Sequence, residues 1–158
     1  MSVIIFAHGL EGSPNGSKIQ TLRNSGNEVL APDFQGMPLI ERVELLEKIS
    51  LDYADKKPIL GGSSYGGLTA AIVAMRFPER FSGLLLCAPA LHLKEPPVND
   101  TTTLIAPEGL PTVIIHGIED DIVPISCSIE YANRSGIEII EFNNFLYSSS
   151  LSPFCLVP

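Results

Sequence analysis

A serine and two glycines in the middle of the chain have a spacing that suits nucleophilic catalysis. They form the pattern Gly62-x-Ser64-x-Gly66, with an apolar segment before it and a helix-forming segment after it. A serine at a sharp strand-to-helix turn lies in strained backbone, and glycines two residues away relieve the crowding. Its hydroxyl would lie beside a helix N-terminus, whose free N–H groups favour an anion. Ser64 is therefore the candidate nucleophile, with an ordinary glycine-rich turn as the alternative.

Two backbone amides are candidates for holding the negative charge that forms when an acyl group is attacked. Gly9 follows the first apolar segment, so the backbone there can come close to a ligand and direct the Leu10 amide at it. The amide of Tyr65 would be the second donor. Losing one such donor typically lowers a rate by about 10²–10³. We expect His8 to shape this loop by hydrogen bonding rather than to act as a base.

An acidic segment after a later apolar run supplies the candidate for a supporting acid. An acid four residues beyond the end of that strand can reach across to orient a histidine, which favours Asp120. The alternative is a solvated acidic turn that caps the helix beginning near Pro124, and Asp120 or Asp121 could do only that. We expect His116 to satisfy a hydrogen bond at the end of the strand.

These residues need a scaffold that brings their loops to one edge. Short apolar runs predict buried strands near residues 3–7, 28–32, 58–60, 81–88, 112–115 and 137–142. Helices are expected over residues 17–23, 39–54 and 124–133, and from the serine turn to about residue 77. This alternation predicts an α/β fold with a mostly parallel sheet of about six strands, covered on both faces. The proline-rich residues 89–111 are expected to form a short irregular cap loop.

The composition bounds the function classes. The 158 residues predict one domain, and the net charge of −8 argues against nucleic acid or an anionic membrane as partner. No apolar run approaches the roughly 20 residues of a membrane span, and no basic segment marks a signal peptide. The three cysteines are an odd number without metal-ligand spacing. We therefore expect a reduced, cytoplasmic protein with no metal or other cofactor.

The order of these motifs resembles the α/β-hydrolase superfamily. The segment His8-Gly9-Leu10-x-x-Ser13-Pro14-x-x-Ser17-Lys18 is similar to the small, nearly lidless serine esterases of that superfamily. The resemblance covers residues 3–142 and implies a three-layer sandwich. It also implies a small ester or thioester substrate and no cofactor. By this resemblance Ser64 is the nucleophile, Asp120 is the triad acid, Leu10 and Tyr65 supply the oxyanion amides, and His8, Gly9, Gly62 and Gly66 support the loops.

The sequence departs from that family after residue 142. The family places its triad histidine in the loop after the last strand, whereas no histidine follows His116 here. Residues 143–158 carry no charge, are rich in serine and apolar residues, and do not predict the usual last helix. An atypical tail produced by a frameshift or a premature stop is the favoured explanation. The alternatives are a natural pseudoenzyme that lost its base, or a substitute base, for which His92 is the candidate.

The missing base sets the expected level of activity. Removing a triad base costs on the order of 10⁶ in turnover and leaves about 10³–10⁴ over water. We therefore expect an impaired serine hydrolase, with a non-catalytic binding protein on the same scaffold as the alternative. Without a last helix, one face of the sheet and the sixth strand would stay uncovered, which predicts self-association.

Overall fold

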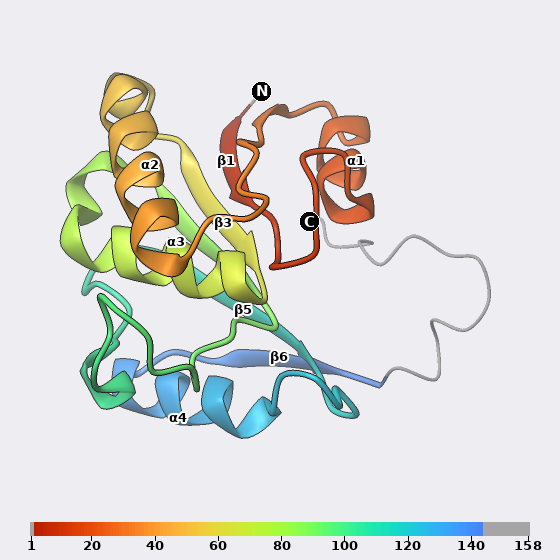
Figure 1. The fold of residues 1–158 in the computed structure, drawn as a ribbon, viewed down its shortest axis with the longest axis vertical. Helices are drawn as coiled ribbons and strands as arrows, with labels where there is room; N and C mark the ends of the chain where they lie inside the picture. The colour runs from red at the N-terminus through yellow and green to blue at the C-terminus, as the bar shows by residue number, and fades with distance from the viewer. Residues whose placement is uncertain (1, 144–158) are drawn as a thin grey trace.

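The chain folds around a parallel sheet (Figure 1). The computed structural model describes residues 2–143. Within them, six strands lie in the order β2-β1-β3-β4-β5-β6, and each adjacent pair is parallel. The predicted α/β fold is therefore confirmed. The strands are β1 (Val3–Ala7), β2 (Glu28–Leu30), β3 (Ile59–Ser63), β4 (Gly83–Cys87), β5 (Thr112–Gly117) and β6 (Ile139–Phe142), and the α-helices are α1 (Ser17–Asn24), α2 (Leu39–Asp52), α3 (Tyr65–Arg76) and α4 (Ile125–Ser135).

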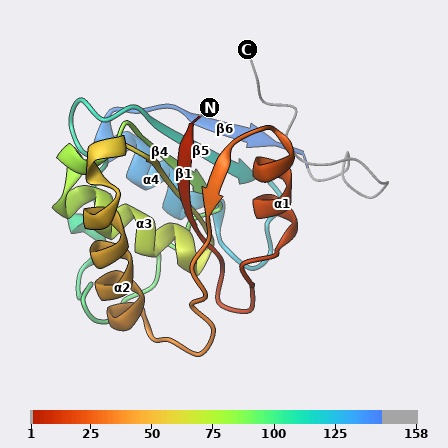
Figure 2. The same cartoon turned by 90° about the horizontal axis from the view of Figure 1, so that it is seen from above.

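Helices cover the sheet on both faces, because successive side chains of a strand point to opposite sides. Ile5 of β1 belongs to a large apolar core that includes side chains of α2, α3 and α4. Ile4 and Phe6 point the other way and pack with Ile19 of α1. Figure 2 shows α1 across the sheet from α2 and α3. The protein is thus the three-layer sandwich that was expected.

The third strand is longer than its sequence suggests. The apolar residues alone predicted a strand that ends at Leu60, with the glycines after it in a turn. β3 continues to Ser63, since it pairs in register with β4 as far as Ser63 opposite Cys87. The strand therefore ends directly before Ser64, and α3 begins directly after it. No loop residue lies between β3 and Ser64, or between Ser64 and α3.

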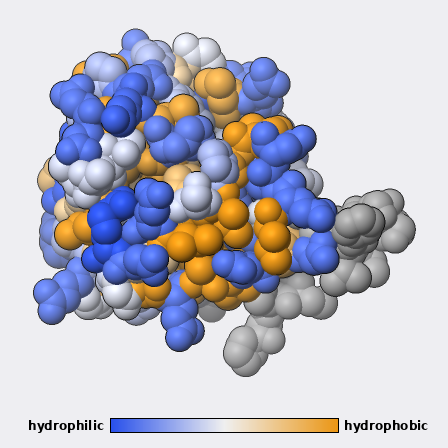
Figure 3. All heavy atoms as spheres, turned by 90° about the horizontal axis from the view of Figure 1, so that it is seen from below, coloured by the Kyte–Doolittle hydropathy of each residue, from blue (hydrophilic) through white to orange (hydrophobic). Residues whose placement is uncertain are grey.

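Apolar side chains are exposed on the α1 side of the sheet at β5 and β6. Ile114 points into the large core, so its neighbour Val113 points to the α1 side, where it is 41% exposed. Ile140 of β6 is 42% exposed. Apolar residues also gather on the face of the molecule shown in Figure 3. The predicted absence of a last helix falls on residues 144–158, which lie outside the described residues.

Residues 89–111 contain no α-helix or strand and pack against the large core. They include a short 3-10 helix (Thr101–Thr103) and an isolated bridge between Glu95 and Val98. Val98 and Leu104 are buried in the same core as side chains of α2, α3 and α4. The segment is therefore irregular, as expected, and fixed to the core at several points. Among residues 2–143, no helix is both long enough and apolar enough to cross a bilayer.

Candidate active site

Ser64 lies in a strained conformation at the junction of β3 and α3. Its backbone has φ 54° and ψ −118°, which a residue with a Cβ rarely adopts. Besides the helical bond to Leu68, two backbone hydrogen bonds hold it there: its N–H donates to the carbonyl of Cys87 (3.0 Å), and its carbonyl accepts the N–H of Ala90 (2.9 Å). Strain of this kind costs about 1–3 kcal/mol and persists where surrounding structure enforces it. The two bonds join Ser64 to the end of β4 and to the segment that follows it.

The glycines on either side of Ser64 leave room for this junction. A Cβ on Gly62 would overlap the carbonyl of Gly66, and a Cβ on Gly66 would overlap the carbonyl of Ala7. Backbone atoms cannot yield as the end of a flexible side chain can. The spacing of Gly62 and Gly66 around Ser64 is therefore a steric requirement of the turn, as the sequence predicted.

The loop after β1 lies next to Ser64. A Cβ placed on Gly9 would be 3.5 Å from the Cβ of Ser64, so the two backbones are neighbours. His8 is buried, and its Nε2 accepts the N–H of Phe34 at 2.9 Å. Its Nδ1 therefore carries the proton and donates to the carbonyl of Gly9 at 2.8 Å. His8 shapes the loop, as expected, and neither ring nitrogen is left for proton transfer.

The two candidate oxyanion amides come from this loop and from α3. Tyr65 is the first residue of α3, so its N–H is one of those that a helix leaves without an intrahelical acceptor. Among residues 2–143, the N–H of Leu10 has no hydrogen-bond acceptor either. Leu10 is 58% exposed and lines the same pocket as Ser64 and Tyr65.

Asp120 lies at the same edge of the sheet as Ser64, in the turn after β5. Its Oδ1 accepts the N–H groups of Ile122 (3.0 Å) and Val123 (2.8 Å), so this carboxylate caps the turn. Its Oδ2 is 3.6 Å from Nε2 of His116. Ile122 and Val123 line the pocket with Ser64, whereas Asp120 is not among the lining residues. Asp120 thus closes its own turn, whereas among the described residues no side chain caps the start of α4, so the predicted helix cap is not formed; the role of triad acid stays a prediction.

His116 is fully buried and is occupied at both ring nitrogens. Its Nε2 donates to the carbonyl of Val123 at 2.9 Å, and its Nδ1 is bonded to the hydroxyl of Ser128 at 2.8 Å. This is the structural role expected from the sequence. Of the three histidines in the sequence, only His92 is exposed and lines the pocket.

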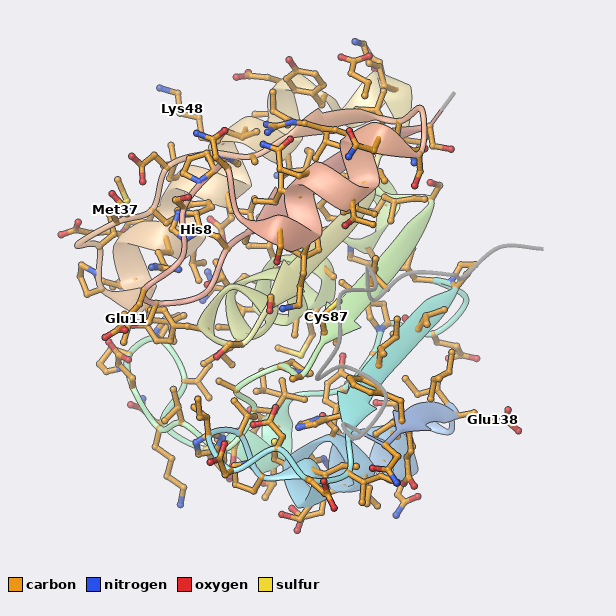
Figure 4. The ribbon with its side chains drawn as sticks, turned by 90° about the vertical axis from the view of Figure 1, so that its right-hand side faces the viewer. His8, Glu11, Met37, Lys48, Cys87 and Glu138 are labelled. Carbon is orange, nitrogen blue, oxygen red and sulfur yellow. The ribbon has the colours of Figure 1, made fainter. Side chains whose placement is uncertain are left out.

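An open pocket of about 970 Å³ connects these groups. Its walls come from the loop after β1, the start of α2, the start of α3, residues 90–95 and the turn after β5. Figure 4 shows two of its residues, Glu11 and Met37, on one side of the molecule together with His8. No set of three or more His, Cys, Asp or Glu within the described residues is arranged to hold a metal ion. The lining residues are Gly9, Leu10, Glu11, Gly12, Gly36, Met37, Pro38, Ser64, Tyr65, Ala90, His92, Leu93, Glu95, Ile122 and Val123.

Sequence reasoning missed two charged residues beside the site. Glu95 accepts the phenolic O–H of Tyr65, with both of its oxygens at 2.8 Å. Burial and this hydrogen bond raise the pKa of Tyr65 to about 12, so the phenol stays protonated and keeps donating. Arg42 of α2 is fully buried and donates to the carbonyl of His8 at 2.9 Å. Arg42 lies three residues after Leu39, on the apolar stripe of α2, and this position was the signal that could have revealed it.

Solved structures resemble this chain over most of its length. A protein assigned to the α/β-hydrolase superfamily, from Xanthomonas campestris pv. campestris, has a TM-score of 0.73 and 24% identity, and the match covers 90% of this chain and 87% of that one. Est1E from Butyrivibrio proteoclasticus, solved with ferulic acid bound, has a TM-score of 0.75 and 18% identity over 90% and 80% of the two chains. A monoacylglycerol lipase from Paleococcus ferrophilus has a TM-score of 0.67 and 19% identity over 89% and 84%.

These likenesses concern the fold, since all three proteins are less than one quarter identical to this chain. No family model matches the sequence, and no curated protein matches it. What the site does must therefore be argued from its own residues.

Proposed function

Since this chain has the α/β-hydrolase fold, we propose that it is a serine hydrolase that cleaves small acyl esters or thioesters, with Ser64 as nucleophile. The observation that carries the proposal is the strained backbone of Ser64 beside an open pocket. If this serine had no chemical role, replacing it with glycine or changing the turn would remove the strain without loss of function. Strained residues held by their surroundings cluster at active sites.

The reaction follows from the groups around Ser64. Its Oγ attacks the acyl carbon while a base takes the hydroxyl proton. The carbonyl oxygen becomes an oxyanion that faces the amides of Leu10 and Tyr65. The tetrahedral intermediate then expels the alcohol or thiol, which takes up the proton. Water attacks the acyl-serine by the same route, releases the carboxylic acid and regenerates Ser64.

The pocket lining favours small, uncharged substrates. Apolar side chains such as Met37 and Leu93 form much of it, and the charged groups among its described lining residues are the carboxylates of Glu11 and Glu95. Apolar walls with a few polar groups are typical of small-molecule sites. Because the described residues of the lining include no lysine or arginine to attract an anion, we expect neutral esters to bind better than negatively charged ones.

The general base that takes the proton from Ser64 is the group that the site supplies least well. His8 and His116 are buried with both ring nitrogens bonded, so His92 is the imidazole that could take the proton from Ser64. We propose His92 as a substitute base that lies outside the usual position of a triad histidine. Such an arrangement is less effective than a triad, and loss of a triad base costs on the order of 10⁶ in turnover. We therefore expect slow turnover with a reactive Ser64.

The second candidate function is a non-catalytic binding protein on the same scaffold. It is favoured by the bonding of both ring nitrogens in His8 and in His116, which leaves neither of these histidines to activate Ser64. The pocket would then hold a small neutral molecule without chemistry. Reactivity at Ser64 separates the two candidates, since a binding protein does not need an activated hydroxyl.

A fluorophosphonate probe, read by intact mass and peptide mapping, tests the proposal. We expect a single adduct on Ser64 that is lost in Ser64→Ala and kept in Ser63→Ala, the adjacent matched serine. Replacing His92 with Gln should slow labelling by about 10²-fold or more, in the range of a lost general base. Absence of labelling in the folded wild-type protein would favour the binding protein. Unchanged labelling in His92→Gln would remove His92 as the base.

Location and self-association belong to the same proposal. Cys87 and Cys127 are buried and unpaired, which suits a reducing, cytoplasmic environment. The exposed Val113 and Ile140 offer an apolar surface through which copies of the chain could associate. Light scattering over a range of concentrations should show association, and a strictly monomeric protein would contradict this expectation.

A further inference from the structure

Arg42 has surroundings that a surface arginine does not have. It lies on α2 and none of its surface is accessible. Its guanidinium carbon lies 4.7 Å from the ring centre of Tyr65 and 5.5 Å from that of Phe34. Burying a charged group without partners is costly, so a buried arginine must be satisfied where it lies. The contacts that satisfy it show what it does.

The guanidinium binds backbone carbonyls rather than a carboxylate. Nη1 donates to the carbonyl of His8 (2.9 Å), Nε to that of Met37 (3.2 Å), and Nη2 makes a longer contact with that of Gly9 (3.5 Å). Burial lowers the pKa of Arg42 from its ordinary value, and the negative charges of nearby Asp33 and Glu95 oppose that shift. The group therefore remains a cation at neutral pH. Its planar fork of donors suits two successive carbonyls in a way that a lysine ammonium does not.

The contacts with His8 and Gly9 fix the direction of the next amides. In a trans peptide the C=O and the following N–H point in opposite directions. The described chain has a cis peptide only at Pro96-Pro97, so the Gly9–Leu10 peptide is trans. With the Gly9 carbonyl turned toward Arg42, the Leu10 N–H points away from Arg42. The same N–H has no acceptor among residues 2–143, and Leu10 is one of the residues that line the pocket.

Two other donors share the Gly9 carbonyl. They are Nδ1 of His8 (2.8 Å) and the N–H of Gly12 (3.2 Å), both from the same loop. Arg42 differs from them because it comes from α2 and also holds the preceding carbonyl of His8. It therefore ties two consecutive peptide planes of the loop to a rigid helix. The Tyr65 ring stacked on the guanidinium links this anchor to the first residue of α3, which carries the other candidate amide.

We propose that Arg42 is the positioning residue that sets the Leu10 amide in its oxyanion-binding orientation and ties the loop after β1 to the start of α3. This inference rests on the proposed function. Without Arg42, the Gly9–Leu10 peptide can rotate, and its carbonyl rather than its N–H can face the pocket. Arg42 touches no substrate and acts only through the backbone that it holds.

The test compares Arg42→Lys and Arg42→Met with matched variants of Arg80. Arg80 also donates to a carbonyl, that of Glu47 (3.0 Å), and stacks on an aromatic ring, that of Phe77 (3.7 Å), but it does not line the pocket. Arg80→Lys and Arg80→Met therefore report the general effect of losing such an arginine. Circular dichroism and thermal unfolding establish which variants fold.

The rate of fluorophosphonate labelling at Ser64 is the kinetic readout. We expect folded Arg42→Lys to label about 10²-fold more slowly than wild type, the effect of one lost oxyanion donor, while Arg80→Lys labels normally. Guanidinium at non-denaturing concentration should partly restore Arg42→Gly, and ammonium at the same concentration should not. Equal rates in Arg42→Lys and wild type, or an equal loss in Arg80→Lys, would overturn the proposal.

Crystal structures of wild type and Arg42→Lys provide a readout that does not depend on reactivity. We expect the Gly9–Leu10 peptide to be rotated in the variant, or the loop to adopt more than one conformation. An unchanged peptide orientation would refute the positioning role even if the enzyme were inactive. Conversely, wild-type protein that does not label would refute the serine hydrolase, while the peptide orientation would still decide the role of Arg42.

Discussion

Replacing Ser64 with glycine should stabilise the protein while removing its nucleophile. The residue has φ 54°, a conformation that glycine adopts without steric cost. Ser64→Ala is the reference, because it removes the hydroxyl but keeps the Cβ that causes the strain. The difference between the two variants therefore isolates the backbone strain at this position.

The magnitude follows from two opposing contributions. Relief of strain at a residue held in such a conformation is worth about 1–3 kcal/mol. Glycine also makes the unfolded chain more flexible, which costs about 0.4–1 kcal/mol. Ser64→Gly should thus be about 1 kcal/mol more stable than Ser64→Ala, with a melting temperature about 2–4 °C higher for a chain of this size.

Urea unfolding at pH 7 measures this difference, provided that the slope of the free energy against denaturant stays unchanged. Ser63 gives the matched control, since it ends β3 and does not have positive φ. There the sign should reverse, with Ser63→Gly about 0.5–1 kcal/mol less stable than Ser63→Ala. If Ser64→Gly were no more stable than Ser64→Ala, the backbone would not be strained and the argument for a functional turn would fail.

Three further predictions test the packing around the site. Gly66→Ala should lower the free energy of unfolding by about 3 kcal/mol or more, because the new Cβ overlaps the carbonyl of Ala7. The control variant Gly83→Ala should be nearly neutral, and urea unfolding measures both. Burial raises the pKa of the Cys87 thiol to about 11 from 9.0, so the unfolded chain loses this proton at lower pH than the folded protein does. The free energy of unfolding should therefore fall between pH 9 and 11 by about 1.4 kcal/mol per pH unit. Cys87→Ala should remove this pH dependence, and an equal slope in both proteins would contradict the prediction. Ser128→Ala removes the hydroxyl on Nδ1 of the buried His116 and should cost about 1–3 kcal/mol in chemical unfolding, while no loss would mean that the bond is dispensable.

Most of the scaffold could be predicted from the sequence because its pattern is strong. The apolar residues 3–7 form β1 as expected, and the helical period that begins at Leu39 gives α2. The expected parallel sheet of about six strands is confirmed, and the solved structures confirm the α/β-hydrolase fold. The end of β3 was wrong by three residues, because the pairing of Ser63 with Cys87 is a contact between strands that a single segment does not reveal.

The site could be predicted only in part. The spacing of Gly62, Ser64 and Gly66 is a local steric requirement, so the sequence motif alone predicts this part of the site. Arg42 was missed, since a charged residue in an amphipathic helix usually faces water and the carbonyls that satisfy it come from the loop after β1. The bond between Tyr65 and Glu95 also joins segments distant in the sequence. Such contacts depend on how the loops meet, which local patterns do not encode.

The central claim is that Ser64 faces two backbone donors at the edge of the sheet. A crystal structure of the protein after reaction with a small fluorophosphonate tests it most directly. We predict phosphorus bonded to Oγ of Ser64, with the phosphoryl oxygen about 2.7–3.1 Å from the amide nitrogens of Leu10 and Tyr65. An unmodified Ser64, or a phosphoryl oxygen turned away from both amides, would contradict the claim.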